Sequence, residues 1–370
     1  MSIPILLADL TLKVLQLPRN SARTMLLAGS SLHSDPSGYR RYESHRQLEQ
    51  TAVYGTSIAY RYRYSSNNLG LISTPDIQPG QHINLAIAGD SFSEGQGGYP
   101  WVIPLQREWL QRNGLRSINY AIAGSGFGDF AATARVARQQ HRADKVLILF
   151  IEHDAYRPYQ LMGSNQACSF YSNGILDHLL GPFTCNLYGI VWHHVPAGLT
   201  DQQVIRASLA RQNYGVFPAL NALLLQISQQ ISQKMSPSVS RPNTASAPRG
   251  GAQDSAPLRY GPLPQASIEA IQTITRLYGR DHVLMVQLPD QPGAASAANK
   301  GSRLHFQRVL HQATGLTVLD LASSCRLSQG DFHQLDSHPN SKGYAKLASC
   351  VRDNPRIRAF VEAETSAPTL

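Results

Sequence analysis

Long apolar runs are missing from this 370-residue chain. No apolar run reaches the roughly 18 residues that a membrane-spanning helix needs, so no full span is predicted. The opening segment 2–18, SIPILLADLTLKVLQLP, is apolar at helical spacing, but Asp9 and Lys13 interrupt it. It also lacks the early basic region and small-residue cleavage site of a secretory signal. The segment fits an amphipathic packing helix in a cytoplasmic protein, or the remnant of an anchor that would give membrane proximity and an extracytoplasmic location.

Cysteine is scarce. The four cysteines, Cys168, Cys185, Cys325 and Cys350, are too few for a disulfide scaffold. They fall into two pairs that are each local in sequence, which permits two bridges in an exported protein. The alternative is four free, buried thiols.

Acidic residues are fewer than basic ones. The 33 Lys+Arg against 24 Asp+Glu give a net charge of +9 and a pI near 9.5. Such an excess suits nucleic acid, an anionic membrane or an acidic polysaccharide, but the arginines are scattered. No zinc-finger spacing or RNA-binding signature occurs, so no nucleic-acid partner is expected. The adjacent His193 and His194 lack further ligands at metal spacing, so neither a metal nor a cofactor is predicted.

What the chain does contain is a globular composition, with 42% hydrophobic and 15% charged residues. Helical stretches separate five β-rich apolar runs, which are residues 83–88, 117–123, 145–151, 282–289 and 317–321. This alternation predicts an α/β fold, a three-layer α/β/α sandwich around a five-stranded, mainly parallel, flavodoxin-like sheet. In such sheets the active groups gather at the carboxyl ends of the strands.

Composition also divides the chain into segments. Residues 1–80 are expected to form an N-terminal extension packed on the core, and residues 81–154 together with 266–360 the α/β/α domain. Between these two parts, residues 155–235 form an insertion. Residues 236–265 are rich in Pro, Ser, Ala and Gly, a composition that buries too little apolar surface to order itself, so a flexible linker is predicted.

One serine stands where the first predicted strand turns into a helix, in the stretch NLAIAGDSFSEGQGG at 84–98. There the hydroxyl of Ser91 lies at the rim of the sheet, and its own amide is close enough to a helix start to donate to a developing oxyanion. Asp90 is expected to order the turn, with a place in the lining of the site as the alternative. An ordinary Ser/Asp helix cap followed by loop glycines would have the same sequence.

A nucleophilic serine needs a base, and one histidine lies in a suitable place. His338 follows the last predicted strand in LDSHPNSKGYAKLASCV at 335–351, with Asp336 two residues upstream. An acid at this spacing fixes the tautomer of the ring and leaves the other ring nitrogen for Ser91. A surface loop whose polar residues cap helices explains Asn340 but not His338.

Oxyanion donors are expected at the ends of the two intervening strands. Gly124, in NYAIAGSGFG, can bring a backbone N–H to the rim, and His153, in FIEHDAY, can add a side-chain donor. Asp154 either lines the site or has a structural role. Tyr156, Tyr159 and Trp192 would form a sugar-binding lip or pack the insertion.

These stretches resemble the conserved blocks of the SGNH/GDSL hydrolases. GDSF at 89–92 matches the first block, NYAIAGSG the second and DSHPNSKGYAKLA the last, over residues 83–154 and 282–350. The chain departs from the family in two places. His153 stands where the third block has an oxyanion-donating Asn. Leu335 occupies the usual Asp position, and Asp336 lies one residue closer to the histidine, as in the SGNH-like polysaccharide acetyltransferases.

The resemblance implies a metal-independent serine esterase that hydrolyses a short-chain ester, such as an acetyl group on a carbohydrate. Ser91 would be the nucleophile, His338 the base and Asp336 its orienting acid, with Ser91, Gly124 and His153 as the oxyanion hole. One alternative is an O-acyltransferase that acts on polysaccharide with the same triad. The other is a catalytically inactive domain that binds a glycan or a partner protein.

Overall fold

The computed structural model describes residues 23–35, 38–157, 160–163, 166–169, 192–209, 262–291, 294 and 297–363. The apolar opening segment, Cys185, Tyr159 and nearly all of the predicted linker lie outside these ranges. Within them, no helix is long and apolar enough to cross a membrane. The same residues contain no group of three or more His, Cys, Asp or Glu side chains arranged to hold a metal ion.

The centre of the molecule is a five-stranded sheet in which every pairing is parallel. Its strands are β6 (Leu85–Gly89), β7 (Ser117–Asn119), β8 (Lys145–Phe150), β12 (Val283–Gln287) and β13 (Val318–Asp320). They lie in the order β13-β12-β8-β6-β7, which is 2-1-3-4-5 when the strands are counted along the chain. This is the flavodoxin-like order, so the predicted fold class is confirmed.

The second strand is shorter than the sequence predicted, ending at Asn119 rather than at residue 123. The side-chain oxygen of Asn119 accepts a hydrogen bond from the amide of Ala121, 3.1 Å away. Such a turn, closed by a side chain two residues back, competes with the ladder and ends the strand. Beyond it, Ile122 still donates to the Gly89 carbonyl oxygen at 3.3 Å, and the chain then enters the loop that carries Gly124.

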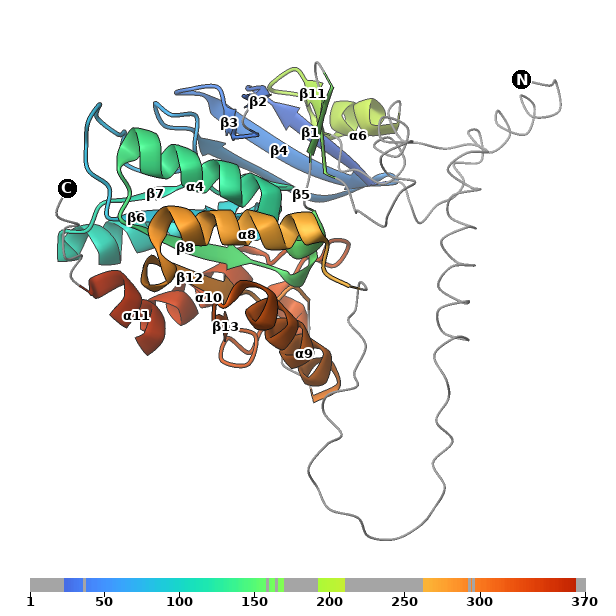
Figure 1. Ribbon diagram of the computed structural model, residues 1–370. Coiled ribbons are helices and arrows are strands. Elements are labelled where there is room, and N and C mark those ends of the chain that lie inside the picture. The colour runs from blue at the N-terminus through green and yellow to red at the C-terminus, as the bar shows by residue number, and fades with distance from the viewer. Residues whose placement is uncertain are drawn as a thin grey trace, which may run out of the picture.

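Helices cover both faces of the sheet, as a doubly covered parallel sheet requires. One face carries α4 (Phe127–His141), α8 (Gln265–Tyr278) and α9 (Ala297–Thr314), with α4 and α8 side by side in Figure 1. The other carries α10 (Ser341–Asp353), α11 (Pro355–Glu362) and the helical segment 102–113. That segment has three short parts, α3 (Val102–Pro104), a π-helix (Leu105–Leu110) and a 3₁₀ turn (Gln111–Asn113).

Residues 23–65 build a second sheet. Antiparallel β1 (Arg23–Ala28), β4 (Gln47–Tyr54) and β5 (Ser57–Ser65) are joined by β11 (Trp192–Val195), which runs parallel to β1. Figure 1 shows this sheet beside α4, and a short hairpin of β2 (Leu32–Ser34) and β3 (Arg40–Tyr42) belongs to the same part.

The alternation YRYRY in β5 explains how this second sheet packs. Side chains two residues apart share one face of a strand, so Tyr60 and Tyr64 enter the same buried cluster as residues of β7 and α4. Arg61 and Arg63 point the other way, and both bind Glu49 of β4. The second sheet therefore shares its core with one helical layer of the α/β/α sandwich.

The remaining described elements are short. They are α2 (Ser91–Glu94), β9 (Gln160–Gly163), β10 (Gln166–Ser169), α6 (Asp201–Leu209) and three 3₁₀ turns at Glu152–Tyr156, Arg280–His282 and Gln329–Asp331.

Cys325 and Cys350 form a disulfide that joins the loop after β13 to α10. Of the two alternatives for this pair, the bridge is therefore present and free thiols are wrong, because the fold brings the loop against the helix and places the two sulfurs together. Cys168 lies in β10, where its side chain is outside the described part, as is the whole of Cys185.

Candidate active site

The turn that carries Ser91 is fixed by its two neighbours. The carboxylate of Asp90 caps α2 by accepting a hydrogen bond from the amide of Phe92, at 2.9 Å. Gly89 leaves no room for a side chain, because a Cβ there would lie 2.3 Å from the Ser93 hydroxyl oxygen and 2.8 Å from the Leu149 carbonyl oxygen. The chain can therefore pass this close to β8 only with glycine. Ser91 follows directly, at the carboxyl end of β6.

His338 is held by a closed loop between the 3₁₀ turn Gln329–Asp331 and α10. Phe332 and Pro339 form an isolated antiparallel bridge across the loop. Asn340 ends it by capping α10, since its side-chain oxygen accepts from the amides two and three residues on, at 3.0 and 3.1 Å. The capping role that the sequence suggested for Asn340 is thus present, and it places His338 at the base of a fixed helix.

The three side chains that the sequence singled out lie together. Nε2 of His338 is 2.8 Å from Oγ of Ser91, and Nδ1 is hydrogen bonded to Oδ1 of Asp336. The backbone amide of His338 donates to the same oxygen, at 2.9 Å. Because a carboxylate only accepts, Nδ1 carries the proton and Nε2 presents its lone pair to the serine hydroxyl.

Burial and a fourth residue complete this arrangement. Ser91, Asp336 and His338 are only 5–6% exposed. The Tyr54 hydroxyl, at the end of β4, donates to Oδ2 of Asp336 at 2.8 Å. Both oxygens of this carboxylate are therefore engaged, and its orientation is set from the second sheet as well as from its own loop.

Asp90 and Asp154 form a buried carboxyl pair beside the serine. Burial, and then the charge of Asp90, raises the pKa of Asp154 well above its usual range. Arg157 lies 3.2 Å from Asp154 and 3.9 Å from Asp90, so one guanidinium serves both. Asp90 also offers Oδ2 to the Ser91 hydroxyl at 3.3 Å. The His338 nitrogen is closer and is the better acceptor for the serine proton.

The loop after β7 is fixed on both sides of Gly124. Gly124 has φ of 80°, in the left-handed region that favours glycine. The Ala123 amide donates to Oε2 of Glu94 at 2.6 Å. Nη2 of Arg40 donates to the Ala123 carbonyl oxygen at 3.3 Å and to Oγ of Ser125 at 3.0 Å. The peptide groups around Gly124 are thus tied to α2 and to β3.

His153 lies in the 3₁₀ turn after β8, with its tautomer set by Arg157. Nη2 of Arg157 is 2.8 Å from Nδ1 of His153. A guanidinium has donors only, so Nδ1 accepts and the proton of the neutral ring is on Nε2. The neutral ring of His153 therefore keeps one N–H donor, on the nitrogen that does not contact Arg157.

Not every residue of the sequence analysis joins this group. Tyr156 is 3% exposed and packs in the core, so it forms no sugar-binding lip. Trp192 and the two histidines after it lie in β11, on the second sheet.

Four contacting residues were not anticipated. Arg157 and Glu94 stand within or beside the conserved blocks, where a charged residue in an otherwise buried stretch is a usable signal. Arg40 and Tyr54 gave no such signal. In sequence, Arg40 lies 85 residues from its partner Ser125, and Tyr54 lies 282 residues from its partner Asp336.

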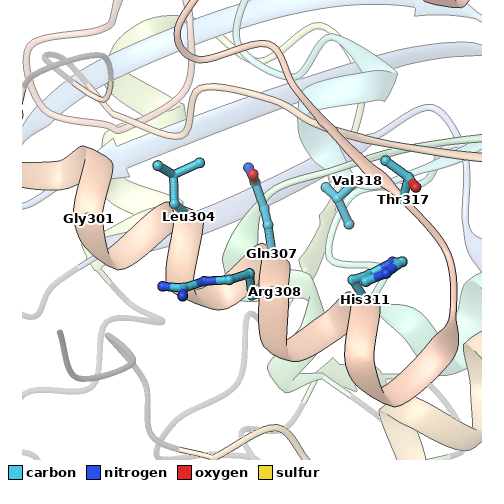
Figure 2. Close-up of a pocket in the computed structure, with 7 residues that line it drawn as sticks. All are labelled: Gly301, Leu304, Gln307, Arg308, His311, Thr317 and Val318. Atoms are coloured by element: carbon cyan, nitrogen blue, oxygen red, sulfur yellow. The ribbon is translucent and has the colours of Figure 1, made fainter. Parts of the chain in front are cut away.

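Two of the hollows among the described residues lie at different places relative to the candidate site. One adjoins the His338 loop and is lined by Ile58, Ala59, Gln329, Gly330, Phe332, His333, Gln334, Leu335 and Asn340. The other, shown in Figure 2, lies between α9 and the start of β13. Because parallel strands start at the edge opposite to the one where Ser91 lies, this second pocket is remote from the candidate site.

Comparisons with known proteins give matches among solved structures alone. No family model and no curated protein matches the chain. A lipase/acylhydrolase from Enterococcus faecalis matches at 12% identity, over 73% of this chain and 94% of its own, with a TM-score of 0.34. The psychrotrophic esterase EstA from Pseudoalteromonas sp. matches at 14% identity, over 74% and 96%, with a TM-score of 0.33. An acetylxylan esterase from Geobacillus stearothermophilus matches at 11% identity, over 80% and 100%, with a TM-score of 0.33.

Matches this distant carry no conclusion about activity. The fold is established by the strand order, the parallel direction of all five strands and the helices on both faces of the sheet. By these features the chain has the three-layer α/β/α fold that its resemblance to the SGNH hydrolases implied.

Proposed function

We propose that this protein is a metal-independent serine esterase in which Ser91, His338 and Asp336 act as the catalytic triad. The observation that carries the proposal is the continuous hydrogen-bond chain from Oγ of Ser91 through both nitrogens of His338 to Asp336. A serine hydroxyl is a weak nucleophile unless a positioned base accepts its proton, and this chain supplies the base and its orienting acid.

In the acylation step, Oγ of Ser91 forms a bond to the ester carbonyl carbon while His338 accepts the hydroxyl proton at Nε2. The carbonyl electron pair moves to oxygen and gives a tetrahedral oxyanion. When the oxyanion collapses, the bond to the alcohol oxygen breaks and the alcohol leaves with the proton from His338. A water molecule then repeats the sequence on the acyl-enzyme, releasing the carboxylic acid and restoring Ser91.

The oxyanion would be stabilised by the amides of Ser91 and Gly124, with Nε2–H of His153 as a third donor. The contact between Arg157 and His153 supports this role, because it keeps the donor hydrogen on the nitrogen that faces away from the guanidinium. A single donor of this kind is worth roughly 10²–10³ in rate in other hydrolases.

A short acyl group on a carbohydrate is the substrate class we favour. Ser91 is buried, which leaves little room for a long acyl chain. The hollow beside the His338 loop presents the exposed side chains of Gln329 and Gln334, whose amides can hydrogen bond to hydroxyl groups. An acetylated sugar combines a small acyl group with many hydroxyls.

Transfer of the acyl group to a sugar hydroxyl is the second candidate. The spacing Asp336-x-His338, similar to that of the SGNH-like polysaccharide acetyltransferases, favours it. The chemistry is the same up to the acyl-enzyme, after which a sugar hydroxyl replaces water.

Hydrolysis of p-nitrophenyl acetate by the wild type and by Ser91→Ala tests the shared first half of both reactions. Release of p-nitrophenol that Ser91→Ala abolishes supports the proposal, and undiminished release by Ser91→Ala rejects it. Incubation with an acetylated polysaccharide donor and a bare polysaccharide acceptor then separates the two outcomes. Hydrolysis yields free acetate, whereas transfer yields acetylated acceptor.

A further inference from the structure

A buried carboxyl group links the first conserved block to the second. Glu94 is the last residue of α2, three positions after Ser91, and it is 1% exposed. Its Oε2 accepts the amide of Ala123 at 2.6 Å. Ala123 is the residue immediately before Gly124, so this bond holds the peptide that leads into the proposed oxyanion donor.

The other oxygen of Glu94 is held by the N-terminal strands. Oε1 accepts the hydroxyls of Tyr42 at 2.6 Å and Tyr64 at 3.0 Å, and the side-chain amide of Gln50 at 3.3 Å. These three side chains come from β3, β5 and β4. The carboxyl group thus accepts four hydrogen bonds in a fixed geometry, and a group so constrained loses little entropy when it positions a neighbour.

The charges around Glu94 agree with this arrangement. Burial raises the pKa of Glu94 to about 7, while the donors from Tyr42, Tyr64 and Ala123 and the charge of Arg40 oppose that rise. The charge of Glu94 in turn adds to the rise that burial causes in the pKa of Tyr62 and of Tyr344. In the protonated acid, the carbonyl oxygen still accepts the Ala123 amide, so the link does not depend on the charge.

We propose that Glu94 is a positioning residue of the oxyanion hole, which aims the Gly124 amide at the acyl oxygen by holding the Ala123 peptide against α2. The inference rests on the proposed function. It makes the N-terminal strands part of the active site, because the tyrosines that orient Glu94 belong to β3 of the hairpin and β5 of the second sheet. An oxyanion donor must be aligned before the reaction to lower the barrier, so loss of the link lowers kcat rather than raising KM.

Two substitutions that introduce side chains of similar length distinguish the effect of losing the hydrogen bond from the effect of changing the side-chain volume. Glu94→Gln keeps an oxygen that accepts from Ala123, whereas Glu94→Met fills the same space without one. For folded Glu94→Met we expect kcat for p-nitrophenyl acetate, and the rate of labelling by a fluorophosphonate, to fall about tenfold or more with KM nearly unchanged. Glu94→Gln should stay within about threefold of the wild type. Wild-type rates in Glu94→Met, or equal losses in both variants, would overturn the inference.

A milder pair keeps the test decisive if Glu94→Met does not fold. The double variant Tyr42→Phe, Tyr64→Phe removes two donors to Oε1 and leaves the Ala123 bond in place, and we expect a roughly threefold to tenfold loss of kcat. Tyr278→Phe is the matched control, because that buried hydroxyl donates to the Ala134 carbonyl oxygen in α4 instead. Equal rates in the double variant and the control would contradict the inference.

Labelling of the wild type separates this inference from the proposed function. A wild type that fluorophosphonate does not label overturns both. A labelled wild type with an unaffected Glu94→Met overturns the positioning role alone.

Discussion

Two sheets meet at the candidate site, and they contribute in different ways. The carboxyl edge of the parallel sheet brings Ser91 and His338 to one rim from short motifs that follow individual strands. The second sheet of β1, β4, β5 and β11 and the neighbouring hairpin of β2 and β3 supply no proposed reacting atom. Tyr54 and Tyr64 of the second sheet nevertheless bind Asp336 and Glu94, and Tyr42 of the hairpin also binds Glu94. The reacting groups are thus encoded locally, while the groups that orient them come from a distant part of the chain.

The largest expected effect tests the parallel-sheet side of this comparison. Asp336→Asn replaces an acceptor that fixes the His338 tautomer with an amide that does not, so kcat for p-nitrophenyl acetate should fall by roughly 10³–10⁴. The fold should be unchanged, because the asparagine oxygen still accepts the His338 amide. Steady-state kinetics with a thermal melt as the folding control provide the measurement. A loss below about tenfold would mean that Asp336 does not orient the base.

Removal of the disulfide tests how much the protein's stability depends on the covalent link between the loop after β13 and α10. Cys325 and Cys350 are 25 residues apart, and the segment between them contains both Asp336 and His338. Replacing both cysteines with Ser should lower the free energy of unfolding by about 3 kcal/mol, mainly because the unfolded chain gains freedom. Urea denaturation measures this, with dithiothreitol-treated wild type as the matched reference. Equal stability of the oxidised wild type and the double variant would contradict the expectation.

The smallest expected effect tests the contribution of the second sheet. Tyr54→Phe removes one hydroxyl donor from Oδ2 of Asp336 and keeps the ring, so kcat should fall about threefold to tenfold, which corresponds to the roughly 1 kcal/mol that a single hydrogen bond typically contributes. Tyr278→Phe again serves as the control. If Tyr54→Phe costs as much as Asp336→Asn, the two sheets contribute equally and the proposed contrast fails.

Most of the central fold could be predicted because apolar β-rich runs and helices alternate without ambiguity. The five predicted runs at 83–88, 117–123, 145–151, 282–289 and 317–321 all contain strands of the sheet. The second run was predicted too long, since apolar letters continue past Asn119 while its side chain turns the backbone. The second sheet was not predicted. Its pairing of β11 with β1 spans more than 160 residues, and no local pattern encodes that pairing. The hairpin of β4 and β5 is local, and the alternation YRYRY in β5 was a usable signal for it.

The site could be predicted as far as its residues lie in short motifs. Ser91, Asp336 and His338 each follow a strand of the same parallel sheet, and the topology alone brings them to one edge. The roles of Tyr54 and Arg40 could not be predicted, because a tyrosine and an arginine in an extension carry no chemical signature until the fold places them. The preferred tautomer of His153 likewise depends on Arg157, four residues away in sequence, in a turn whose geometry the letters do not determine.

Intact-mass spectrometry after treatment with a fluorophosphonate tests the central claim most directly, because only an activated serine attacks phosphorus quickly. We predict a single adduct on the wild type, located at Ser91 by peptide mapping, and none on Ser91→Ala under the same conditions. No adduct on the wild type, or an equal adduct on Ser91→Ala, would contradict the account.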